Sequence, residues 1–284
     1  MKNNHKISLG LINFTNCLPI NYTLEKWALE SIILSWGHPV LINRLIYDGQ
    51  LYVAPVSAFE YIKNENDYVL IKEACITSDA ECGSVILFSN HKLGDLAGKK
   101  IGIPHNSATS INMLKIILNE KGILSDTTNQ IKFVEHKYKK PLKEALEEDF
   151  DAVLYIGDQA LISGIKDNGK FLQYDLGKLW KELTGLPPVF GTWVARADWA
   201  VTHKDDFDRI KFLINKAVEA GLGMYFNDVI QKASSELDLP DYVIKDYLTD
   251  KIKYNFTPKH EKSLNLFKKL YNKLNDHSEA ISYL

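Results

Sequence analysis

Short apolar runs alternate with amphipathic stretches along most of the chain. This alternation is typical of βαβ units that build a largely parallel sheet. The runs that predict strands are Ile7–Asn13, Leu51–Pro55, Tyr68–Ile71, Ser84–Ser89, Lys100–Pro104, Ile131–Val134, Ala152–Ile156, Phe171–Asp175 and Val189–Arg196. The pattern therefore predicts an α/β fold.

The clearest predicted helix follows Pro104. Its apolar positions recur at the spacing of one helix face, and Gly122 suits the position just past its end. Those apolar positions are Ile111, Leu114 and Leu118. Side-chain oxygens that could cap the helix belong to Asn106, Ser107, Thr109 and Ser110.

Beyond Arg196 the apolar spacing is helical to the end of the chain. One helix is marked by Phe207, Ile210, Ile214 and Val218, and another by Leu264, Phe267, Tyr271 and Leu274. Thr202 and Asp205 predict a capping box at the start of the first of these helices.

A helical tail after an α/β region suggests two α/β lobes joined by two crossing strands. We expect the crossings at Ser84–Ser89 and Val189–Arg196. The first lobe would begin with residues 1–90, the second would comprise 91–190, and 191–284 would return to the first lobe with the C-terminal helices. A ligand would lie in the cleft between the lobes, held by strand ends and helix N-termini.

Composition excludes several classes of function. The chain has 284 residues, of which 45% are apolar and 25% charged, so it can bury a substantial core. The net charge of -2 gives no broad positive field for nucleic acid or an anionic membrane. We therefore expect a small-molecule partner, with no nucleic acid, no membrane and no obligatory protein partner.

Cysteine use and the N-terminal pattern predict a cytoplasmic protein. Cys17, Cys75 and Cys82 are odd in number and lack zinc-site spacing, so we expect neither a disulfide framework nor a structural metal. The opening residues lack the features of a signal peptide, and no apolar window is long enough to span a membrane.

Familiar catalytic motifs are absent. The sequence contains no G-x-G-x-x-G, no G-x-x-x-x-G-K-[ST], no G-x-S-x-G and no H-E-x-x-H. Dinucleotide-binding, P-loop, serine-hydrolase and zinc-protease functions are therefore disfavoured, and we expect no cofactor.

Polar loops directly after predicted strands are the candidate ligand groups, because α/β sheets bind ligands there. In 13–19, Pro19 suits the first turn of a helix that could bind an anion, although Asn16 is equally apt as a simple cap. In 55–60, Ser57 and Glu60 form a capping box that needs no function to explain it.

Two further loops are richer in chemistry. The turn 78–84 ends in Gly83 and Ser84, for which a turn role and a functional role are equally apt. In 104–110, several hydroxyls and free backbone N–H groups meet at one helix start, which is the strongest anion-site signal in the chain. His105 in this loop could act as an acid or base, although a lone histidine is more often a packing or surface residue.

Other polar and aromatic residues have simpler explanations. Asp158 could orient a ligand, but a helix cap explains it as well. The aromatic residues Tyr155, Trp180, Phe190 and Trp193 could form the wall of an apolar ring site, or fill the core. The basic run 136–143 is most simply a solvated loop before a helix.

Taken in order, these segments resemble the chorismate dehydratases of the futalosine route to menaquinone, a branch of the periplasmic-binding-protein-like type II fold. The resemblance extends from about Ile7 to Asp198. It rests on the colinear segments Asn16–Pro19, Pro55–Tyr61, Ser78–Asp79, Gly83–Ser89, Ser107–Ser110, Ile156–Asp158, Asp175–Trp180 and Thr184–Pro187. The chain departs from the family pattern at Ala80–Cys82 and is recognisable only as helices after Asp198.

The resemblance implies elimination of water from chorismate to give 3-[(1-carboxyvinyl)oxy]benzoate. A related enzyme that cleaves cyclic dehypoxanthine futalosine carries a catalytic histidine where this chain has Gly157, which favours the dehydratase. The family proposal is substrate-assisted: the substrate's own enolpyruvyl carboxylate takes the proton.

The resemblance also implies roles for individual residues. Asn16 and Ser84 would be oriented at the reacting ring and the leaving hydroxyl. The substrate-binding residues would be Ser57, Gly83, Ser107, Ala108, Thr109, Ser110 and Asp158.

Two other classes of function remain open at this point. A non-catalytic binding protein for a small carboxylate would suit the fold, but the missing export signal counts against it. The effector lobe of a regulator would need a DNA-binding segment, for which the chain has neither spare length nor basic charge.

Overall fold

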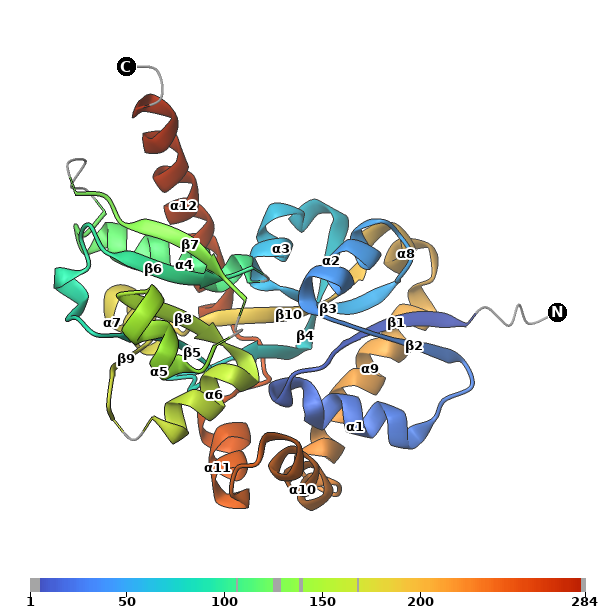
Figure 1. Ribbon diagram of the computed structural model, residues 1–284. Coiled ribbons are helices and arrows are strands. Elements are labelled where there is room, and N and C mark those ends of the chain that lie inside the picture. Colours follow the sequence, from blue (N-terminus) through green and yellow to red (C-terminus); the bar gives the residue numbers. More distant parts are fainter. Residues whose placement is uncertain (1–5, 106, 125–128, 138–139, 168, 282–284) are drawn as a thin grey trace. The chain divides into compact units, whose positions relative to one another are not determined.

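The computed structural model describes residues 6–105, 107–124, 129–137, 140–167 and 169–281 (Figure 1). The chain divides into two compact units. Unit 1 comprises 1–77 and 189–257, and unit 2 comprises 78–188 and 258–284. Asn106, one of the predicted capping residues, lies outside the described residues.

Unit 1 contains a five-stranded sheet in the order β2-β1-β3-β10-β4. Strands β1, β2 and β3 are parallel, whereas β10 is antiparallel to both β3 and β4. Its elements are β1 (Ile7–Ile12), a 3-10 turn (Thr15–Cys17), α1 (Leu18–Trp27), β2 (Ile32–Gly37), α2 (Pro39–Tyr47), β3 (Val53–Ser57), α3 (Ala58–Lys63), a 3-10 turn (Glu65–Asp67), β4 (Tyr68–Thr77), β10 (Val189–Arg196), α8 (Ala197–Thr202), α9 (Lys204–Gly221), α10 (Phe226–Leu237), α11 (Asp241–Asp246) and a π-helical turn (Tyr247–Lys251).

Unit 2 repeats this plan with the order β7-β6-β8-β5-β9. Strands β6, β7 and β8 are parallel, and β5 is antiparallel to β8 and β9. Its elements are β5 (Val85–Ser89), a 3-10 turn (Leu93–Asp95), β6 (Lys100–Pro104), α4 (Ala108–Glu120), β7 (Lys132–His136), α5 (Leu142–Glu144), a π-helical turn (Ala145–Asp149), β8 (Ala152–Ile156), α6 (Gly157–Lys166), β9 (Leu172–Asp175), α7 (Leu176–Thr184) and α12 (Pro258–Ile281).

The two α/β units confirm the predicted fold class, but the observed boundaries differ from the expected ones. The chain changes units at 77/78, directly after β4, and at 188/189, directly before β10. Residues 78–90 therefore belong with the second unit, because β5 pairs only with strands of unit 2.

A third connection at 257/258 takes α12 into unit 2 rather than back to the first lobe. The physical reason is a set of contacts with α7 and α4. The indole Nε1 of the buried Trp180 donates to Ser263 Oγ at 2.9 Å, and its ring packs on Phe267 with centroids 5.6 Å apart. Lys273 also pairs with Glu120 of α4 at 3.2 Å. No helix in the described ranges has the length and apolarity to cross a membrane.

The predicted capping box at Thr202 and Asp205 is wrong. Thr202 is the last residue of α8, and its hydroxyl donates back to the carbonyls of Asp198 and Trp199. Helix α9 begins at Lys204 without a side-chain cap. The threonine thus closes one helix instead of opening the next.

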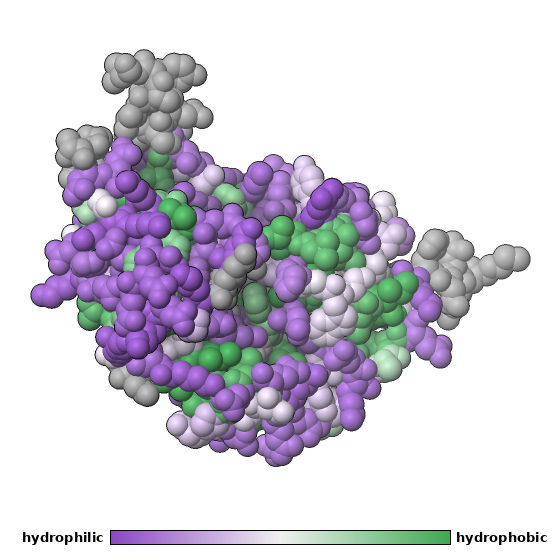
Figure 2. All heavy atoms as spheres, in the orientation of Figure 1, coloured by the Kyte–Doolittle hydropathy of each residue, from purple (hydrophilic) through white to green (hydrophobic). Residues whose placement is uncertain are grey.

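Large apolar side chains remain exposed around the edge strand β2 of unit 1. They belong to Ile33, Trp36, Val40, Leu41 and Tyr47. Figure 2 shows apolar surface over α2 and beside β1 and β2. Among the described strands, β2 pairs only with β1, so none of them covers this edge.

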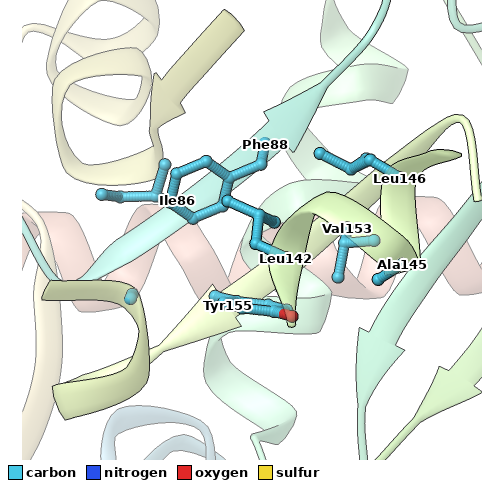
Figure 3. Close-up of a cluster of buried hydrophobic side chains, with 8 residues drawn as sticks. Ile86, Phe88, Leu142, Ala145, Leu146, Val153 and Tyr155 are labelled. Atoms are coloured by element: carbon cyan, nitrogen blue, oxygen red, sulfur yellow. The ribbon is translucent and has the colours of Figure 1, made fainter. Parts of the chain in front are cut away.

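One buried core cluster of unit 2 lies between β5, β8 and the helical segment that begins with α5. Ile86 and Phe88 of β5 meet Val153 and Tyr155 of β8, and Leu142 with its neighbours covers them (Figure 3). All are buried, so this packing holds the sheet against the helical segment.

His136 lies in the same core, contrary to the solvated loop predicted for the basic run. It ends β7, is only 7% exposed, and stacks on Tyr155 with ring centroids 5.5 Å apart. Its Nε2 lies 3.3 Å from the Tyr155 hydroxyl. Residues 138–139 of the run lie outside the described residues, and α5 begins at Leu142.

Acidification is expected to destabilise unit 2 through His136. Burial lowers the pKa of His136 below its ordinary value of 6.5, against an opposing influence of Asp149. The unfolded chain then binds the proton more tightly, so stability is full above pH 6.5 and falls as the pH drops toward the lower folded pKa. His260 contributes with the same sign, because burial also lowers its pKa.

The measurement is the urea midpoint at about pH 7.5 and about pH 5.5 for the wild-type protein and His136→Phe. Phenylalanine retains the ring stack but does not titrate. The variant should lose less stability on acidification than the wild type, because it keeps only His260 of the two buried histidines whose pKa is lowered. An equal loss in both proteins would contradict the assignment to His136.

Candidate functional site

One group of the predicted residues lies at one edge of the unit 2 sheet. The parallel strands β6 and β8 end there, at Pro104 and Ile156. The antiparallel β5 begins at the same edge, because Val85 pairs with Ile156 and Ile86 with Asp175. The carboxyl edge of the sheet therefore gathers the loops that carry the predicted residues Gly83, Ser84, Ala108 and Asp158.

Ser84 is fixed between two neighbouring loops of this edge. It is 3% exposed, and its carbonyl accepts a hydrogen bond from the Gly157 N–H at 2.7 Å. Gly157 opens α6 with a φ of +57°, a conformation that favours glycine. Ser84 is thus rigidly placed beside the start of α6, where Asp158 lies in the first turn.

Helix α4 begins at the same edge with an arrangement suited to an anion. Ser107 makes no capping bond; its hydroxyl donates instead to the hydroxyl of Ser110 at 2.9 Å. The first turn of α4 contains no acidic residue, whereas Asp158 lies in the first turn of α6 and Asp175 caps α7. Among the described helices that start at this edge, α4 is therefore the one most suited to receive a carboxylate.

The predicted residues of this region differ in how far their side chains are exposed to solvent. Thr109 and Ser110 are buried, Ser107 and Gly83 are half-buried, and Ala108 is exposed. His105 is exposed as well. Asp158 is half-buried and is not the helix cap, which is Ile156.

A second group of the predicted residues lies at one edge of the unit 1 sheet. Asn16 follows the carboxyl end of β1, and Ser57 ends the parallel strand β3. Gly191, near the start of the antiparallel β10, pairs with Ser57. The edge therefore brings the loops of Asn16 and Ser57 to the same side of the sheet.

Asn16 is held by its backbone rather than serving as a cap. It lies in the 3-10 turn before α1, whose cap position is occupied by Cys17. The Tyr254 hydroxyl donates to the Asn16 carbonyl at 2.9 Å, and the Cys17 thiol donates to Asn16 Oδ1 at 3.3 Å. Burial raises the pKa of Tyr254 well above its usual range, so its hydroxyl remains a donor.

The capping role of Ser57 is confirmed. Its hydroxyl accepts a hydrogen bond from the Glu60 N–H at 3.2 Å. Asn43 of α2 adds a reciprocal pair: its Nδ2 lies 3.4 Å from Ser57 Oγ, and its Oδ1 accepts from the Ser57 N–H at 3.3 Å. The Glu60 carboxylate accepts instead from Asn64 and Tyr68.

The predicted aromatic wall belongs to the core. Trp180 and Trp193 are 1% and 0% exposed, and Tyr155 is fully buried. Only Phe190 is partly exposed. The aromatic residues in the described parts of both sheets thus mainly support the strands that carry the polar loops.

Sequence reasoning missed the residues that hold the candidate residues of each unit in place, namely Asn43, Tyr254 and, except as part of the resemblance, Asp175. Their partners are distant in sequence: Tyr254 contacts Asn16, and Asp175 contacts Cys82 and Gly83. No local pattern marks such pairs.

The sequence of the chain is similar to a family model and to a bacterial protein. A family model described as menaquinone biosynthesis matches residues 7–273. A protein from Thermus thermophilus named chorismate dehydratase is 28% identical over 204 residues, which cover 67% of this chain and 70% of that protein.

Solved structures show the same fold at low sequence identity. A protein from Archaeoglobus fulgidus is 17% identical with a TM-score of 0.73, covering 98% of this chain and 99% of that one. The periplasmic aliphatic sulphonate binding protein from Escherichia coli is 15% identical with a TM-score of 0.67, covering 95% of this chain and 87% of that one. The fold is therefore periplasmic-binding-protein-like, and the match over residues 7–273 makes this chain a member of the menaquinone biosynthesis family.

Proposed function

We propose that this protein is a chorismate dehydratase, a carbon–oxygen lyase that converts chorismate into 3-[(1-carboxyvinyl)oxy]benzoate and water. The observation that carries the proposal is the similarity to the Thermus thermophilus chorismate dehydratase over two thirds of the chain, within a match to the menaquinone biosynthesis family. The gathering of Ser84, Asp158 and the start of α4 at one sheet edge supports it.

The substrate supplies most of the driving force. The ring proton beside the enolpyruvyl ether is γ to the ring carboxylate through a double bond, so its removal gives a delocalised anion. Loss of hydroxide from the neighbouring carbon then makes the ring aromatic, and the hydroxide leaves as water with the proton that was removed. The protein needs to orient the substrate, stabilise negative charge and exclude water.

Helix α4 is proposed to bind one substrate carboxylate. The hydroxyls of Ser107, Thr109 and Ser110 and the N–H groups of the first turn are the donors, and no acidic side chain of that turn opposes an anion. A carboxylate at this position gains charge-assisted hydrogen bonds together with the favourable end of the helix dipole.

Ser84 and Asn16 are proposed as the catalytic residues. A hydroxyl and an amide can donate hydrogen bonds to the leaving hydroxyl or to the charge that develops during elimination. Neither is a strong base at neutral pH, which fits a reaction in which the enolpyruvyl carboxylate of the substrate takes the proton. Ser57, Gly83, Ala108 and Asp158 are proposed to contact the substrate.

The proposal is tested by proton NMR of chorismate mixed with a catalytic amount of protein in buffer containing EDTA. We expect the ring signals of chorismate to be replaced by those of an aromatic product over many turnovers. Signals that broaden or shift without being replaced would show binding without reaction.

A non-catalytic carboxylate-binding protein is the second candidate. The structural likeness to the sulphonate binding protein of Escherichia coli favours it, because that fold also serves in binding alone. The same NMR experiment separates the two candidates, since a binding protein leaves chorismate chemically unchanged.

A further inference from the structure

The carboxylate of Asp175 is surrounded by backbone donors from two segments of unit 2. Asp175 ends β9 and caps α7, accepting from the Lys178 N–H at 3.0 Å. It also accepts from the Gly83 N–H at 2.7 Å and from the Cys82 N–H at 3.1 Å. One side chain therefore ties a helix start to the turn that leads into β5.

Capping alone does not explain this arrangement. A cap needs a single acceptor for the first turn of its helix, and the Lys178 bond supplies it. Two further bonds reach a turn about 90 residues away in sequence, where Gly83 adopts a φ of +68°. This left-handed conformation turns the N–H groups of Cys82 and Gly83 toward one carboxylate, as in anion-binding backbone turns.

The turn held by Asp175 ends at Ser84. Ser84 follows Gly83 directly, and its carbonyl accepts from the Gly157 N–H at 2.7 Å. The carboxylate thus fixes the backbone on one side of Ser84, and α6 fixes it on the other. A displacement of Cys82 and Gly83 would move the Ser84 hydroxyl.

Resting on the proposed function, we propose that Asp175 is a positioning residue that fixes the Ser84 hydroxyl for the dehydration of chorismate. It acts through the Cys82–Gly83 turn and does not contact the substrate. The Cys82 thiol, which also faces the carboxylate, is fully buried.

Substitutions at Asp175 separate positioning from capping. Serine, asparagine and aspartate are all good helix caps, so a capping role predicts similar behaviour for Asp175→Ser, Asp175→Asn and the wild type. The serine side chain is shorter and has one oxygen. It can accept from the Lys178 N–H, but it cannot also reach the N–H groups of Cys82 and Gly83. Asparagine retains one acceptor oxygen, so it should keep part of the hydrogen bonding to the Cys82–Gly83 turn. Positioning therefore predicts that kcat falls in the order Asp, Asn, Ser.

We expect Asp175→Ser to lower kcat by roughly 10- to 100-fold with little change in KM, because small misplacements of a catalytic group are that costly. The matched control is Asp151→Ser. Asp151 also ties separate segments, accepting from the Lys100 N–H and contacting His91, but it lies at the opposite edge of the same sheet. The Asp151→Ser substitution should leave kcat nearly unchanged.

The decisive test is a double-mutant cycle with Ser84→Ala. If Asp175 acts through Ser84, then Asp175→Ser lowers kcat in the wild-type background but not in Ser84→Ala. The same four proteins are titrated with the product, 3-[(1-carboxyvinyl)oxy]benzoate. Its dissociation constant should change little among them, as KM does. A cooperative urea unfolding transition of each protein is the control that it is folded.

Additive effects of the two substitutions on kcat would overturn the inference. So would equal losses of kcat in Asp175→Ser and Asp151→Ser. A wild-type protein that does not dehydrate chorismate would instead remove the proposed function, and this role with it. An active wild type with additive variants rejects the role of Asp175 alone.

Discussion

Replacement of Ser84 by alanine is expected to lower kcat for chorismate by roughly 100- to 1,000-fold, the usual cost of one donor to charge that develops in a transition state. Ser84 is buried at the sheet edge where the ligand loops meet, and its backbone is fixed by the Gly157 N–H. Loss of the hydroxyl should therefore remove the donor without moving its surroundings. KM should change little, because the proposed carboxylate-binding groups are on α4.

The matched control is Ser89→Ala. Ser89 is a fully buried serine that ends β5, the strand that Ser84 directly precedes, and so it lies at the opposite edge of the sheet, where its hydroxyl donates to the His91 carbonyl. The Ser89→Ala variant should lose about as much stability as Ser84→Ala, but it should retain the kcat of the wild type. Full turnover by Ser84→Ala, or equal losses of kcat in both variants, would contradict a catalytic role for Ser84.

Gly221→Ala is expected to cost stability at or above the upper end of the roughly 1–3 kcal/mol typical of overpacking. Gly221 ends α9, and a Cβ there would lie 2.0 Å from the carbonyl oxygen of Pro19 in α1. Backbone atoms cannot swing aside as a flexible side chain can, so α1 or α9 must shift. The turn that contains Asn16 directly precedes α1 and would move with it.

The measurement is the urea midpoint of Gly221→Ala beside that of Gly94→Ala. A Cβ at Gly94 would have no heavy atom within 4 Å, so this control should unfold like the wild type. We also expect the catalytic activity of Gly221→Ala to fall, since the Asn16 carbonyl is held by Tyr254 in its present place. Wild-type stability of Gly221→Ala would show that the contact between α1 and α9 is not tight.

Buried central strands were predictable from sequence, and the errors have physical causes. β2 was missed because it is an edge strand with no buried residue and no regular alternation. β4 was predicted to end at Ile71, but it continues to Thr77. Exposed Lys72 and Glu73 interrupt its apolar pattern where the pairing with β10 shifts register, so the strand bulges at its polar residues.

The positions of the candidate residues were predictable, but the contacts that hold them were not. Loops after strands could be placed at a sheet edge from the α/β pattern alone. The choice of hydrogen-bond partner depends on tertiary structure: the Ser107 hydroxyl prefers Ser110 to its expected capping role, and Asp175 reaches Gly83. The assignment of α12 to unit 2 likewise depends on the burial of Trp180, which no local pattern reveals.

The mass of the product formed from chorismate tests the central claim most directly. Purified protein is incubated with a large excess of chorismate in EDTA-containing buffer, and the mixture is analysed by mass spectrometry beside a sample without protein. A chorismate dehydratase releases a product lighter than chorismate by one water, in amounts far above the amount of protein. Chorismate that keeps its mass, or that changes only as it does without protein, would contradict dehydratase activity.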